Sequence, residues 1–79
     1  MRLHGIPSGA LIRITEIYAG RELRRSLSQL GIHIGDVVLV QRHVAYGGPV
    51  LIQHRGTQVA LGRNLAKRIR VEQLSGESP

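Results

Sequence analysis

Residues 21–40 read RELRRSLSQLGIHIGDVVLV, and within this stretch the spacing of apolar residues changes from helical to extended. Three leucines recur at intervals of four and three residues, on one face of a helix predicted over residues 21–30: Leu23, Leu27 and Leu30. Gly31 follows, and glycine readily adopts the left-handed conformation that ends a helix. The apolar residues beyond it predict a strand over 37–43, so the segment indicates a short helix leading into a sheet.

Alternating apolar and polar residues predict strands on both sides of this helix. We expect five in all, at 10–18, 37–43, 50–55, 58–61 and 68–73. Ile17 breaks the alternation of the first strand, so a bulge near Thr15-Glu16 is expected. A single helical turn is expected at 63–66.

These elements indicate one mainly-β domain, a small, partly open β-barrel with one short α-helix inserted after the first strand. The domain is predicted to span residues 1–74, followed by a disordered tail at 75–79. Its core must be aliphatic, because the chain contains no Phe or Trp and two Tyr. A chain of 79 residues has little room for a deep active-site cleft.

Composition narrows the classes of function further. The chain has no cysteine, which excludes disulfides and thiolate metal sites and is consistent with a reducing cytoplasm. No apolar run is long enough for a signal peptide or a membrane span, so we expect no direct membrane insertion. The formal net charge of +6 favours polyanions or an acidic protein surface as partners.

Neither catalytic nor metal-binding residues are expected. The serines and carboxylates are scattered, and no nucleophile motif is present. The four histidines lie 29, 10 and 11 residues apart, at no compact ligand spacing: His4, His33, His43 and His54. His43 and His54 flank one predicted hairpin and could approach each other, but they would need further ligands. We therefore expect no metal and no cofactor.

The predicted helix supplies the candidate partner-binding residues. Three arginines near its start oppose the helix dipole and add little to the helix itself: Arg21, Arg24 and Arg25. Their default interpretation is a solvated face, and the hypothesis weighed against it is a contact with a partner. One of Leu23 or Leu27 could remain exposed and anchor a partner. Tyr46, in a glycine-rich loop, is a second candidate anchor.

Nucleic-acid binding is the alternative from another class, because basic small barrels often bind nucleic acid. Single-strand binding usually requires aromatic stacking platforms, and this chain offers Tyr18 and Tyr46. No helix-turn-helix or RNA-recognition signal is present, so a protein partner is favoured.

Several motifs together resemble the ferrous iron transport protein A (FeoA) family. The matching residues are Gly9-Ala10, Leu27-Ser28-Gln29-Leu30-Gly31-Ile32, Gly35 before Val37-Val38, Gly47-Gly48-Pro49-Val50, Val59-Ala60-Leu61, Ala66, Ile69 and Val71. The resemblance covers roughly residues 3 to 73. From the residues alone, Ala60 is expected where strands or a helix approach closely.

The resemblance implies an SH3-like fold and a role in ferrous iron uptake. Family members act beside a large membrane GTPase transporter, FeoB, so the implied partner is a FeoB-type transporter and the implied location is the inner face of the membrane, reached through that partner. Related SH3-like domains are also appended to iron-dependent repressors, which leaves a repressor-like module as an alternative. Exposed strand edges would allow weak homo-oligomers.

Overall fold

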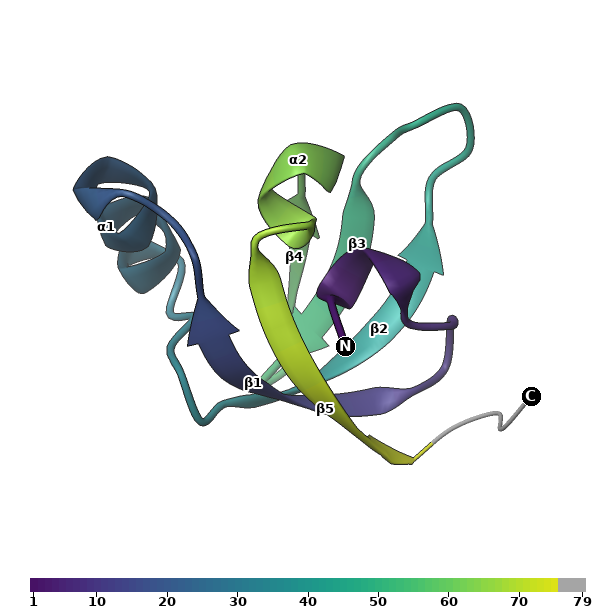
Figure 1. The fold of residues 1–79 in the computed structure, drawn as a ribbon. Helices are drawn as coiled ribbons and strands as arrows, with labels where there is room; N and C mark the ends of the chain where they lie inside the picture. The colour runs from purple at the N-terminus through teal and green to yellow at the C-terminus, as the bar shows by residue number, and fades with distance from the viewer. Residues whose placement is uncertain (76–79) are drawn as a thin grey trace.

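The computed structural model describes residues 1–75 of the chain. Figure 1 shows a curled sheet that carries short helices at its rim. In chain order the elements are η1 (Leu3–Gly5), β1 (Leu11–Ile17), α1 (Arg21–Gln29), β2 (Val37–His43), β3 (Val50–His54), β4 (Thr57–Leu61), α2 (Arg63–Ala66) and β5 (Ile69–Ser75). The five strands, the inserted helix and the helical turn are all confirmed, with bounds within two residues of the predicted ones.

The strands form one antiparallel sheet in the order β4-β3-β2-β1-β5. The first and last strands of this order do not pair with each other, so the barrel is partly open. The outer edge of β5 is partly covered, because Arg2 bridges Arg70 and the Val71 amide donates to the Met1 carbonyl at 2.7 Å. The free edge of β4 has no such cover among the described residues.

The bulge predicted in β1 is present. The register of β1 against β5 shifts between Ile14 and Glu16, which turns Ile17 back toward the interior. An extra residue on one strand increases the local twist, and this twist helps the sheet curl. Ile12 and Ile14 stay on the inner face, where both are buried.

The core is entirely aliphatic, and no polar or charged residue within the described chain is buried. Each strand contributes its inward positions, such as Val38 and Val40 of β2 and Ile69 and Val71 of β5. This alternation of buried and exposed positions is what the sequence pattern predicts for a sheet with one solvent-exposed face.

One part of the core was not anticipated, and two expectations were wrong in detail. Leu3 and Ile6 are fully buried, where η1 packs against α2 and β5. Ala60 is exposed on the outer face of β4, whereas Ala66 of α2 is fully buried. Ser75 pairs with Leu11 and ends β5, so it does not belong to the predicted tail. Residues 76–79 of that tail lie outside the described residues.

Candidate partner-binding surface

Helix α1 ends in a glycine cap that fixes it to the core. Gly31 has a φ of +80°, and its amide donates to the Ser28 carbonyl at 2.9 Å. The Ile32 amide donates to the Leu27 carbonyl, also at 2.9 Å. These two bonds form a Schellman motif, which brings together the side chains at its two ends. Those side chains are Leu27 and Ile32, and both are buried.

Leu27 is the single buried residue of α1. It is 1% exposed, so it is a core residue, and its assignment as a partner contact is corrected. Leu23 and Leu30 flank it on the same stripe, yet they are 38% and 50% exposed. Figure 1 shows α1 lying to one side of the curled sheet. The candidate anchor that remains on this helix is Leu23.

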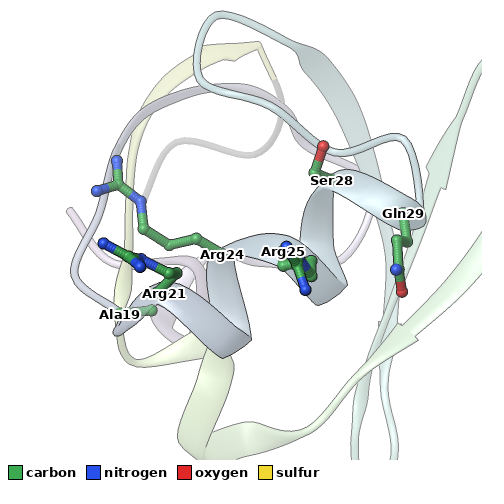
Figure 2. Close-up of a pocket in the computed structure, with 6 residues that line it drawn as sticks. All are labelled: Ala19, Arg21, Arg24, Arg25, Ser28 and Gln29. Atoms are coloured by element: carbon green, nitrogen blue, oxygen red, sulfur yellow. The ribbon is translucent and has the colours of Figure 1, made fainter.

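The three candidate arginines lie together on one face of α1. They line a shallow open depression with neighbouring small and polar residues: Ala19, Arg21, Arg24, Arg25, Ser28 and Gln29 (Figure 2). In Figure 2 the side chains of Arg21 and Arg24 extend toward the same side of the helix. At about 100° per residue, Leu23 faces away from Arg21 and Arg25, and Arg24 lies between the two faces.

The electrostatics of this face favour an external anion. Gly20 caps the helix without a side-chain hydrogen bond. No side chain of the cap therefore compensates the backbone amides of the first turn, where the positive end of the helix dipole lies. The one acidic residue in the first turn is Glu22. Within residues 1–75, none of the three arginines of α1 lies in a salt bridge. The face is therefore positively charged and uncompensated.

Tyr46 lies apart from the arginine face. It is fully exposed at a φ of 60°, in the connection between β2 and β3. Figure 1 shows that connection projecting on the opposite side of the molecule from α1. The predicted contact residues thus divide into an arginine face, a half-exposed Leu23, a buried Leu27 and a separate Tyr46.

His43 and His54, which could have come near each other, lie toward opposite ends of β3. His43 pairs with Val50 at one end of the β2–β3 hairpin, while His54 adjoins the turn at the other end of β3. The Nε2 of His43 lies 2.6 Å from the Ile6 carbonyl, and this contact ties the N-terminal segment to β2.

Sequence reasoning missed a polar cluster around Asp36. The carboxylate accepts the His33 backbone amide at 2.8 Å, and its Oδ2 lies 3.3 Å from Nε2 of His54. Nδ1 of His54 is 3.3 Å from the Val37 carbonyl. His33 and His54 are 21 residues apart, which matches no compact ligand spacing, so the sequence did not indicate this cluster. Among residues 1–75, no three His, Asp or Glu side chains are arranged to hold a metal ion.

His4 sits in η1 beside several cations. Its Nδ1 is buried without a hydrogen-bond partner. Partial burial, followed by the charges of Lys67, Arg2 and Arg63, holds the pKa of His4 below its usual value. The imidazole is thereby kept neutral in a strongly basic neighbourhood.

A family model described as the FeoA domain matches residues 1–73. The chain belongs to the FeoA family. A relative from Methanocaldococcus jannaschii, described as a putative Fe(2+) transport protein A, is 38% identical over 64 residues, which span 81% of this chain and 76% of that protein. The resemblance found in the sequence is thus confirmed, and the family is one involved in Fe(2+) transport.

Solved structures agree with the fold. The crystal structure of an iron uptake regulatory protein (FeoA) superposes with a TM-score of 0.81 at 27% identity, over 94% of this chain and 96% of that one. The manganese regulator SloR gives a TM-score of 0.84 at 20% identity, over 94% of this chain and 34% of that one. The second likeness shows the fold alone. The small SH3-like barrel is therefore confirmed. No helix in the described part of the chain is long and apolar enough to cross a membrane.

Proposed function

We propose that this chain is an accessory protein of ferrous iron uptake that binds the cytoplasmic surface of a FeoB-type membrane GTPase through the arginine face of α1. The observation that carries the proposal is the helix itself, which has one buried residue and three exposed arginines that lie in no salt bridge within residues 1–75. Membership of the FeoA family supports the role in iron uptake.

The position of the arginines favours recognition over stability. Cations in the first turns of a helix oppose its dipole, so these residues weaken α1 slightly when it stands alone. An acidic surface on a partner would offset this destabilisation of α1, because its carboxylates would interact favourably with both the guanidinium groups and the uncapped amides. Charge pairs of this kind chiefly raise the association rate and the specificity.

We also propose that the chain does not act as an enzyme. Ser28, His33 and Asp36 do fall in the order of a nucleophile, base and acid, with Ser28 Oγ 3.2 Å from His33 Nε2. However, His33 Nδ1 is 3.7 Å from Asp36 Oδ2, which is too long for a hydrogen bond. Ser28 also lies in the last turn of α1, where backbone carbonyls would repel a developing oxyanion. Any GTP hydrolysis would belong to the partner.

Charge reversal on α1 tests the proposed contact. The Arg21→Glu/Arg24→Glu variant should remain folded, because glutamate near the start of a helix interacts favourably with the dipole. Its association rate with the purified cytoplasmic domain of the transporter should fall at least about tenfold, as measured by surface plasmon resonance.

The matched control is Arg42→Glu/Arg55→Glu, which changes the net charge equally at two exposed positions away from α1. It should bind within about threefold of the unaltered chain. Undiminished binding by the α1 variant would show that this face is not the contact. An equal loss in both variants would show that the effect comes from the overall charge.

A further inference from the structure

The positive charge of the molecule is concentrated around one side of the barrel. Five cations there lie outside α1: Arg2, Arg63, Lys67, Arg68 and Arg70. Together with the three arginines of α1 they form what we call the basic rim. Figure 1 shows α1, α2 and the start of β5 on the same side of the sheet.

One part of the rim gathers around Tyr18, at the end of β1. The Tyr18 amide donates to the Arg68 carbonyl at 2.7 Å, and the guanidinium of Arg70 lies 5.8 Å from the centre of the Tyr18 ring. Arg2 bridges Arg70 from the other side of β5. Tyr18 is three residues before Arg21, so this cluster lies two residues along the chain from the start of α1.

The other part of the rim surrounds His4. Lys67 and Arg63 of the α2 region and Arg2 all lie close enough to lower the pKa of this imidazole. Arg2 belongs to both groups, so the rim is continuous from α1 across β5 to α2 and η1.

The rim accounts for the net charge of the whole chain. It holds eight of the eleven Lys and Arg residues and two carboxylates, Glu16 and Glu22, an excess equal to the formal charge of +6. The other described residues hold three arginines and two carboxylates, Asp36 and Glu72. A field this one-sided orients the molecule toward an extended negative surface.

We propose that the basic rim binds the anionic headgroups of a phospholipid membrane. The cations come from five segments and enclose no deep pocket, which suits a broad charged surface. Tyr18 is 49% exposed beside Arg68 and Arg70, and such a side chain can enter the boundary between headgroups and acyl chains. Each cation near an anionic leaflet strengthens binding roughly fivefold.

The same surface fits nucleic acid less well. Single-stranded nucleic acid is held by stacking of successive bases on aromatic rings, and Tyr18 is the single aromatic residue of the rim. Its face is already occupied by Arg70.

Vesicle sedimentation with the purified chain tests the proposal in the absence of any protein partner, so the result is independent of the transporter contact. The chain should bind vesicles of phosphatidylcholine with phosphatidylglycerol and not vesicles of phosphatidylcholine alone. Raising the salt from about 50 mM to about 500 mM should abolish the binding.

The decisive variant is Lys67→Gln/Arg68→Gln, which removes two rim charges outside α1. We expect it to weaken vesicle binding about 25-fold. The matched control, Arg42→Gln/Arg55→Gln, removes two exposed charges outside the rim and should weaken binding by less than about threefold. Equal weakening by both variants, equal binding to neutral vesicles, or tighter binding to a single-stranded oligonucleotide that displaces the vesicles would each overturn the proposal.

Discussion

Replacing Leu27 with alanine should weaken the packing of α1 against the barrel. Leu27 is 1% exposed and supplies the one buried side chain of the helix, against its Schellman partner Ile32. Leu→Ala substitutions at fully buried sites cost about 2–5 kcal/mol, and the value depends on how far the neighbours can close the cavity. Because α1 is otherwise loosely packed, it can shift inward, so we expect about 3 kcal/mol.

That loss is large for a domain of this size. A chain of 79 residues has a total free energy of unfolding of about 4–12 kcal/mol. A loss of about 3 kcal/mol should lower the melting temperature by roughly 12–24 °C. Thermal and urea unfolding followed by circular dichroism would measure both quantities.

Leu23→Ala is the matched control, since it removes the same atoms from a site that is 38% exposed on the same helix. It should cost about 1 kcal/mol, less than Leu27→Ala, because part of the Leu23 side chain already contacts water and its removal leaves no closed cavity. Equal losses for the two variants, or a loss below about 1 kcal/mol for Leu27→Ala, would refute the conclusion that one side chain anchors α1.

Three further substitutions test the backbone and the charges. Gly31→Ala should destabilise the fold by about 1 kcal/mol in urea unfolding, because its φ of +80° is costly for any residue with a Cβ, although the space around it is open. Gly48→Ala should cost about 1–3 kcal/mol, because the new Cβ would lie 2.7 Å from Cγ1 of Val44; an unchanged urea midpoint would show that this loop yields freely. The lowered pKa of His4 means that the unfolded chain takes up its proton first, so stability is lost as the pH falls below about 6.5. His4→Gln should therefore lose less stability between about pH 7 and pH 5 than the unaltered chain, and parallel pH profiles would contradict this assignment.

The fold could be predicted from the sequence because its local signals agree with one another. The helical spacing of Leu23 and Leu27 ends at Gly31, and the structure uses that glycine as a cap. The broken alternation at Ile17 marks a real change of register. In each case the residue pattern reflects a requirement of the backbone that involves residues only a few positions apart. Such local requirements can be recognised in a single sequence.

What could not be predicted depends on contacts between distant segments. Leu3 and Ile6 show no periodicity, and they are buried because α2 and β5 happen to cover them. The helical pattern did not distinguish Leu23 from Leu27, but in the structure Leu27 alone is buried. The meeting of Asp36 with His54 likewise follows from strand register, which spacing along the chain does not encode.

The structure separates the parts of this molecule that hold the fold from the parts that can meet a partner. The interior is aliphatic and closed by glycine-dependent corners, so no described polar side chain is needed within the core. The cations lie outside this core, and eight of the eleven belong to the basic rim. A molecule with most of its positive charge in one rim approaches a negative surface in a preferred orientation. That orientation would bring the arginine face of α1 to the membrane, where a transporter's cytoplasmic surface would be met, so the two proposed contacts would reinforce each other through a raised local concentration.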